Sequence, residues 1–236
     1  MNNMILELGR EVMPPGLAED ANDPLFRSSK FRPAPFLCET DSRILVPSML
    51  AFAAREYHAA GVLTDGQSHL FLTLDGTPGS LRVARAMVRY AAGTNGEYSG
   101  VIGIWLEIEE EFDHRLWSQA MRFLCDISNS PSILVLFVSS INRPSVQKLM
   151  QHLCGHIPGL MRSVPWRYDY AQLADIICSY IRYMGVYICE PERFAAKLEM
   201  KIAGRVTTSE QAVMLGDILA RQATPDEEDA RLSRAM

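Results

Sequence analysis

The 236-residue sequence lacks any apolar run close to the roughly 20 residues that a membrane-spanning helix needs. It also lacks a basic segment followed by an apolar one at its N-terminus, so we expect neither a secretory leader nor a membrane anchor. Basic residues are not in excess, because the formal net charge is −5, and this disfavours a nucleic-acid-binding surface spread over the whole molecule. No Ser/His/Asp or Cys/His catalytic arrangement can be built from residue spacing alone.

Cysteine is scarce and odd in number, which disfavours a disulfide framework. Most of the five cysteines lie within apolar segments, where buried reduced thiols are usual. We therefore expect reduced thiols and a cytoplasmic protein. The cysteines are Cys38, Cys125, Cys154, Cys178 and Cys189.

Hydrophobic residues make up 48% of the chain, enough for one large domain or two modest ones. Two apolar runs without strict alternation, Val101–Ile108 and Ile133–Val138, are typical of central strands in a parallel sheet. Helical patterns separate the expected strands, as in βαβ units. The sequence therefore predicts a three-layer α/β fold with a parallel sheet.

The predicted domain layout has four parts. Residues 1–40 form an irregular N-terminal arm broken by prolines, and residues 41–167 form the α/β core. Residues 168–223 form a small α-helical lid, and residues 224–236 form a charged tail. The predicted lid helices are Leu173–Tyr183, Pro191–Ile202 and Ser209–Gln222.

A glycine-containing turn, Gly76–Ser80, joins the apolar strand-like run Leu70–Leu74 to a helical pattern that starts near Leu81. Strand, glycine turn and helix in this order are the layout of a phosphate-binding loop, in which backbone N–H groups at a helix N-terminus face an anion. The phosphate-binding motif reads G-x-x-x-x-G-K-[ST]. The second glycine, the lysine and the following hydroxyl residue are all absent from this turn.

This stretch resembles the H-x-x-F-x-G-x-P-G-T-G-K-T-T-V-A-R segment of AAA+ ATPases of the red-type Rubisco activase and stage V sporulation protein K group. The matching residues are His69, Gly76, Pro78, Gly79, Ser80, Val83, Ala84 and Arg85. A second segment, Ile157–Trp166, resembles the family's N-P-G-L-x-S-R-F-P. The resemblance spans Ile44–Ala223 and implies a P-loop-like, AAA+-like core with a helical lid.

The resemblance also shows where catalytic groups are missing. Leu106 stands in the place of the Mg²⁺-binding aspartate, and Glu107 in the place of the catalytic glutamate. Ser139 or Asn142 would replace the polar residue that senses the γ-phosphate. The place of the trans-acting arginine is taken by Ser163, one position after Arg162, and Gln211 lies near the expected lid arginine.

The family also has a strand and a helix with a pore loop between the phosphate-loop helix and the acidic strand. The interval Ala91–Gly100 is too short for both. Alternatively, Val101–Ile108 is that second strand, and Ile133–Val138 is the acidic strand without a carboxylate.

We therefore expect a pseudo-ATPase that binds no cofactor and acts as a scaffold or regulatory subunit. Its partner would be an active AAA+ paralogue or another copy of itself, with Arg162 and Arg167 as possible interface residues. Any residual nucleotide site would consist of Gly76, Pro78, Gly79, Ser80 and Arg82. One alternative is an ATPase that uses ATP and Mg²⁺ with Arg82 and Glu107 as catalytic groups. A second alternative is an accessory ATPase relative associated with nucleic acid, which the acidic balance disfavours.

Two clusters of possible metal ligands are interpreted as surface groups. Glu109–Glu111 and Asp113 crowd the end of a predicted strand, where acidic residues are usually solvated. His152 and His156 share a helix face, but Cys154 points away from both. We therefore expect no metal site.

Overall fold

A computed structural model describes residues 9–10, 33–40, 43–66, 68–93, 96, 98–107, 114–139, 144–162 and 168–223. The chain divides into two compact units, one of residues 13–166 and one of residues 1–12 with 167–236. Each unit is described by itself.

The first unit contains a sheet of five parallel strands in the order β2-β3-β4-β1-β5. Its strands are β1 (Phe36–Thr40), β2 (His69–Leu74), β3 (Val101–Leu106), β4 (Ile133–Ser139) and β5 (Met161–Arg162). β3 and β4 are buried along almost their whole length, which explains why their sequences are continuously apolar.

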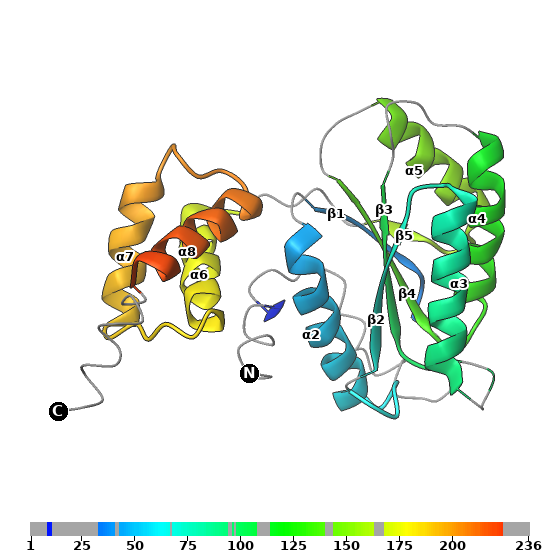
Figure 1. The fold of residues 1–236 in the computed structure, drawn as a ribbon, viewed down its shortest axis with the longest axis horizontal. Coiled ribbons are helices and arrows are strands. Elements are labelled where there is room, and N and C mark those ends of the chain that lie inside the picture. Colours follow the sequence, from blue (N-terminus) through cyan, green and yellow to red (C-terminus); the bar gives the residue numbers. More distant parts are fainter. Residues whose placement is uncertain are drawn as a thin grey trace. The chain divides into compact units, whose positions relative to one another are not determined.

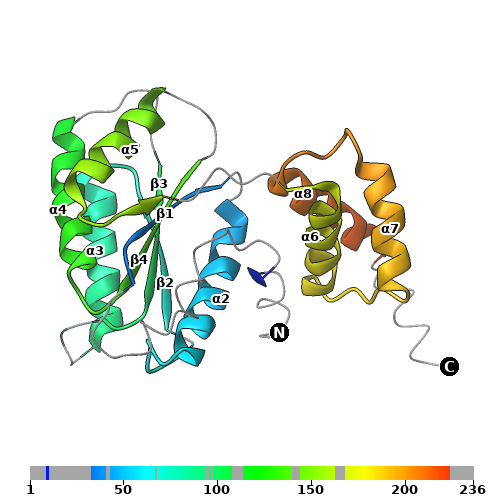
Figure 2. The same cartoon turned by 180° about the vertical axis from the view of Figure 1, so that it is seen from behind.

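Helices cover both faces of this sheet, with α2 on one face and α3, α4 and α5 on the other (Figure 1; Figure 2 shows the same layers from behind). The predicted α/β architecture with a parallel sheet is confirmed. The bounds are η2 (Arg43–Leu45), α2 (Val46–Ala59), α3 (Pro78–Ala92), α4 (His114–Ser128) and α5 (Pro144–His156).

The core fills the space between the layers. On one face, side chains of α4 and α5 such as Trp117, Leu124 and Leu149 pack with strand residues in one buried cluster. On the other face, α2 lies so close to β3 that a Cβ at Gly103 would overlap the side chain of Leu50. Glycine at position 103 therefore permits the close approach of helix and sheet.

The expectation that residues 1–40 form an irregular arm is wrong for Phe36–Thr40, which is the central strand β1. β1 pairs with β4 on one side and β5 on the other, with Phe36 aligned with Val135 and Met161. Leu37 and Cys38 are completely buried. Long-range pairing and burial thus decide the structure of a short segment whose neighbouring prolines indicated irregular chain.

Among the described residues of the interval Ala91–Gly100, no strand lies between α3 and β3, and α3 leads directly to β3. The strand that the sequence did not predict is β1, which precedes α2 and β2 in the chain.

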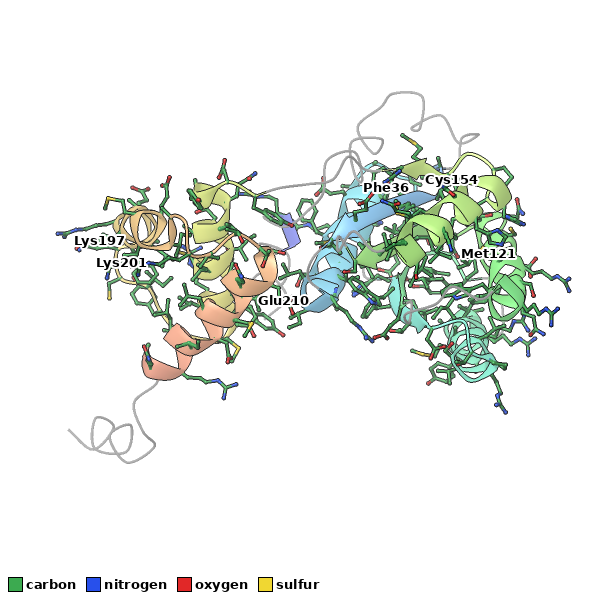
Figure 3. All side chains as sticks on the ribbon, turned by 90° about the horizontal axis from the view of Figure 1, so that it is seen from above. Phe36, Met121, Cys154, Lys197, Lys201 and Glu210 are labelled. Atoms are coloured by element: carbon green, nitrogen blue, oxygen red, sulfur yellow. The ribbon has the colours of Figure 1, made fainter. Side chains whose placement is uncertain are left out.

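The second unit contains three helices among its described residues after 167, close to the predicted bounds: α6 (Tyr170–Tyr183), α7 (Pro191–Ile202) and α8 (Ser209–Ala223). Asp169 and Gln172 form a reciprocal capping box at the start of α6. α6 packs against both other helices. Figure 3 shows Lys197 and Lys201 projecting from α7.

None of the helices in the described part of the chain combines the length and apolar character required to cross a bilayer.

Candidate functional site

The turn that follows β2 has the predicted strand–turn–helix geometry. Gly76 adopts a φ of 81°, in the left-handed region that favours glycine. Thr77 is the N-cap of α3, and its hydroxyl accepts a hydrogen bond from the Ser80 N–H at 3.2 Å. Pro78 occupies the first turn of α3, where its missing N–H costs nothing.

The anion-binding groups of this turn are already occupied by the carboxylate of Asp75. Its Oδ1 accepts hydrogen bonds from the Thr77 N–H at 2.8 Å and the Thr77 hydroxyl at 2.7 Å. The Ser80 hydroxyl donates to the same oxygen. A negatively charged group of the protein therefore sits where a phosphate would have to bind.

Hydrogen bonding also changes the ionisation of Asp75. Desolvation by itself would raise the pKa of this carboxyl, but the hydrogen bonds from Ser80 and Thr77 outweigh it, so the pKa lies below its ordinary value of 3.8. The ionised form thus stabilises the turn.

Asp75→Asn tests this contribution, because asparagine keeps an acceptor oxygen and loses the charge. Since the folded-state pKa is depressed, the stabilising contribution is complete above the unfolded pKa and is lost as pH falls through the folded value. We expect the variant to be less stable than wild type by about 0.3–1 kcal/mol at pH 7, a small loss because the turn is solvent-screened. Urea unfolding from pH 7 to pH 2 should show this difference shrinking below about pH 4, and a pH-independent difference would contradict the assignment.

The two glycines of the turn differ in how closely neighbouring atoms approach them. A Cβ on Gly76 would lie 2.7 Å from Nε1 of Trp117 in α4, so the fold demands glycine at position 76. A Cβ on Gly79 would meet only the Thr77 hydroxyl at 3.6 Å, an ordinary contact. Packing therefore explains Gly76 but not Gly79.

Arg82, the predicted substitute for the missing lysine, is an exposed residue of α3. Glu107, the other residue of the proposed hydrolase, follows β3 and forms its ion pair with Arg43. Moreover, β2 lies at the outer end of the strand order, so the turn belongs to the margin of the sheet and not to its centre.

The carboxyl edge of the sheet holds a different cluster of polar groups. Arg43, just after β1, donates to the Thr73 hydroxyl at 2.7 Å and forms an ion pair with Glu107 at 3.4 Å. Both charged side chains are about half exposed, so this pair contributes little stability. Its consequence is electrostatic, since the Glu107 carboxylate lies beside a guanidinium.

A second ion pair on this edge involves the predicted interface residue Arg162. Its Nε and Nη2 both donate to Oε1 of Glu39, at 3.0 and 2.6 Å, and the Glu39 side chain is only 13% exposed. Arg162 thereby links β5 to the central strand β1 inside this chain.

The centre of the carboxyl edge lies between β1 and β4. The connections after these strands lead to helices on opposite faces of the sheet, α2 and α5 (Figure 1). In open α/β sheets ligands bind at such a switch point. Thr40, a buried polar residue, and Ser139 end the two strands, and their alignment places the predicted γ-phosphate sensor Ser139 beside Thr40.

The remaining predicted site residues are not gathered here. Gln211 accepts a hydrogen bond from the Thr207 N–H at 2.8 Å and thus caps α8. The rings of His152 and His156 lie 4.0 Å apart on α5, and the described residues contain no group of three or more possible metal ligands. Asn142, Arg167, Glu109–Glu111 and Asp113 lie outside the described residues.

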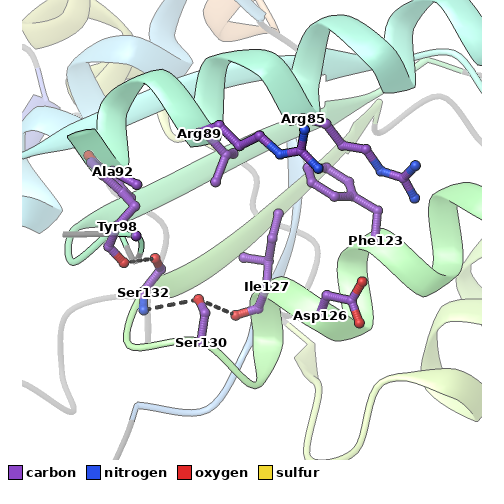
Figure 4. A pocket seen from close by; sticks show the side chains of 11 residues that line it. Arg85, Arg89, Ala92, Tyr98, Phe123, Asp126, Ile127, Ser130 and Ser132 are labelled. Carbon is purple, nitrogen blue, oxygen red and sulfur yellow. Dashed lines mark hydrogen bonds between the residues drawn. The ribbon is translucent and has the colours of Figure 1, made fainter. Parts of the chain in front are cut away.

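A surface cavity of about 250 Å³ lies at the opposite end of the sheet, between α3 and α4 (Figure 4). Arg85 and Arg89 border it from α3, and Phe123 and Asp126 from α4. Burial first, and then the nearby charge of Asp65, raises the pKa of the lining residue Tyr98 to about 12. None of the predicted site residues lines this cavity.

Sequence reasoning missed Asp75, Trp117 and Arg43. Asp75 carried a recognisable signal, because an aspartate two residues before a threonine at a turn commonly bonds the backbone there. Trp117 and Arg43 carried none, since their partners lie 30 or more residues away in the chain.

No family model and no curated protein matches this chain. Among solved structures, the crystal structure of Saccharomyces cerevisiae RIF2 is similar with a TM-score of 0.39 and 10% sequence identity. The alignment covers 93% of this chain and 82% of RIF2. A likeness of this size does not bear on function.

Proposed function

We propose that the chain is an AAA+-like module that has lost nucleotide hydrolysis and acts as a scaffold or regulatory subunit through protein contacts. The order of elements supports the family assignment. In the family that the sequence resembles, two strand–helix units precede the acidic strand, and β1–α2 and β2–α3 are such units. Helices α6, α7 and α8 then correspond to the lid.

The observation that carries the proposal is the connection between β1 and α2. In this arrangement β1 is the strand that should lead into the phosphate loop. Strand β1 ends at Thr40 and helical structure begins at Arg43, so that only Asp41 and Ser42 lie between them. A phosphate loop needs eight residues with two glycines and a lysine, and this connection has no glycine and no lysine.

The turn after β2 supports the same conclusion independently. Its N–H and hydroxyl groups already bond the Asp75 carboxylate. Binding a triphosphate there would require displacing this carboxylate or bringing two anions together, and both are unfavourable. The Thr77 N–H and the Thr77 and Ser80 hydroxyls are therefore not available to a triphosphate at this turn.

Nucleotide titration tests the proposal. We expect no saturable binding of a fluorescent ATP analogue with Mg²⁺ up to about 1 mM, which corresponds to a binding free energy weaker than about −4 kcal/mol. We also expect no phosphate release. The matched variants are Arg82→Ala and Arg43→Ala, which should behave as wild type does. Tight binding with turnover would refute the proposal, and loss of that turnover in Arg82→Ala would establish the hydrolase that uses Arg82 and Glu107.

A further inference from the structure

Strand β2 forms the outer edge of the sheet. Among the described strands, β2 pairs only with β3. Its sequence, HLFLTL, contains no acidic residue, lysine, arginine, proline or glycine, although edge strands normally carry such residues to prevent pairing with another chain. Four of its six side chains are partly exposed, namely His69, Leu70, Phe71 and Thr73.

The helix beside this edge carries an exposed apolar ridge. Val83, Met87 and Tyr90 of α3 are 59%, 41% and 90% exposed. Their spacing of four and then three residues places them on one side of the helix. We call Val83, Met87 and Tyr90 the α3 ridge.

The α3 ridge faces away from the neighbouring helix α4. Leu81 and Ala84 of α3 are buried against the sheet. On one flank, Arg85 lies over the Phe123 ring of α4 at 5.9 Å and borders the cavity with Arg89 (Figure 4). At 100° per residue, the ridge lies on the opposite flank. Because α3 packs on the edge strand β2, this flank overlooks the open edge.

We propose that a second copy of this chain pairs with β2 in the antiparallel direction and forms a symmetric dimer with a continuous ten-stranded sheet. A two-fold axis perpendicular to the sheet keeps both α3 helices on the same face. It brings the two ridges together above the paired strands. This inference deepens the proposed scaffold function because it names the partner and the surface. The scaffold role of the dimer rests on that proposed function.

Self-association fits this surface better than a charged partner does. A two-fold interface needs a patch that complements itself, and an open strand edge meets this condition because it can pair with its own antiparallel copy. The ridge and strand contain no acidic or basic residue apart from His69. Two chains of net charge −5 can therefore meet here without placing like charges in contact.

The size of the contact also fits a dimer. Stable interfaces bury about 800 Å² on each partner. Tyr90 alone, at 90% exposure, offers on the order of 150–200 Å². Val83, Met87 and a strand edge about 20 Å long bring the contact towards the required area.

The experiment is sedimentation velocity of the full chain between about 5 and 200 µM. We expect wild type to form dimers, and Val83→Glu to weaken dimerisation on the order of 100-fold because it would bury an unpaired carboxylate in an apolar contact. Met214→Glu on α8 is the matched control, since Met214 is also 59% exposed on a helix. This control should dimerise as wild type does.

Two further variants guard against a folding defect. Tyr90→Glu alters a side chain that is 90% exposed, so it should leave the circular dichroism spectrum unchanged and still dissociate the dimer. Leu70→Lys places a charge at the strand edge and should also dissociate the dimer. Because Leu70 packs partly against the core, this variant is used only together with a thermal unfolding curve that shows it to be folded. A monomeric wild type, with the surface covered by another protein or another segment of the chain, would overturn the proposal. So would a dimer that survives all three ridge and edge variants.

The nucleotide titration separates this inference from the proposed function. If the protein hydrolyses ATP but Val83→Glu still dissociates the dimer, the proposed function fails alone. If no nucleotide binds and wild type is monomeric, the dimer fails alone.

Discussion

Leu37→Ala is expected to lower the free energy of unfolding by about 2–5 kcal/mol, the range for removing a large side chain from a well-packed core. Leu37 is completely buried in β1, between β4 and β5. The lost side chain leaves a cavity in the core cluster between the sheet and its helices, which the surrounding side chains can fill only in part. Urea unfolding at pH 7, followed by far-ultraviolet circular dichroism, measures the change.

The control for this variant is Ile44→Ala, a few residues further along the chain. Ile44 is 59% exposed, so its truncation should change stability by no more than about 0.5 kcal/mol. If residues 36–40 belonged to an irregular arm, the two variants would have similarly small effects. A large loss for Leu37→Ala alone therefore distinguishes a central strand from an arm.

Gly76→Ala is expected to cost about 2–4 kcal/mol, from two causes that add. The φ of 81° is unfavourable for alanine by about 1 kcal/mol, and the added methyl would lie 2.7 Å from Nε1 of Trp117. Forcing an extra carbon into such a contact typically costs a further 1–3 kcal/mol. Thermal and urea unfolding of the variant measure the sum.

Gly61→Ala isolates the first of these causes. Gly61 has a φ of 76°, almost the same as Gly76, but a Cβ there would meet no atom within 4 Å. This variant should therefore lose only about 1 kcal/mol. Equal losses for the two variants would show that the contact with Trp117 does not constrain the turn.

The sequence predicted individual helices and strands better than it predicted the order of the strands in the sheet. The bounds of α7 agree with the prediction, and the strand Ile133–Val138 differs from β4 by one residue. These segments have strong apolar periodicity or long apolar runs, so local pattern and tertiary burial indicate the same structure. β1 lacked such a pattern because it has only five residues and follows Pro33 and Pro35.

The position of the candidate turn in the sheet could not be predicted either. The sheet order places β2, which leads into the Gly76 turn, at the margin and β1 in the interior. Strand order depends on pairing between distant segments, which a single sequence does not reveal; the Arg43–Glu107 pair, 64 residues apart, is hidden for the same reason.

The late pairing of β1 has a consequence for the protein's synthesis. Phe36 emerges from the ribosome about 100 residues before its partner Val135. At a translation rate of roughly 5–20 residues per second, the nascent apolar segment waits on the order of 5–20 s before its place in the sheet exists. During that time it is a ready target for chaperones that bind exposed apolar chain.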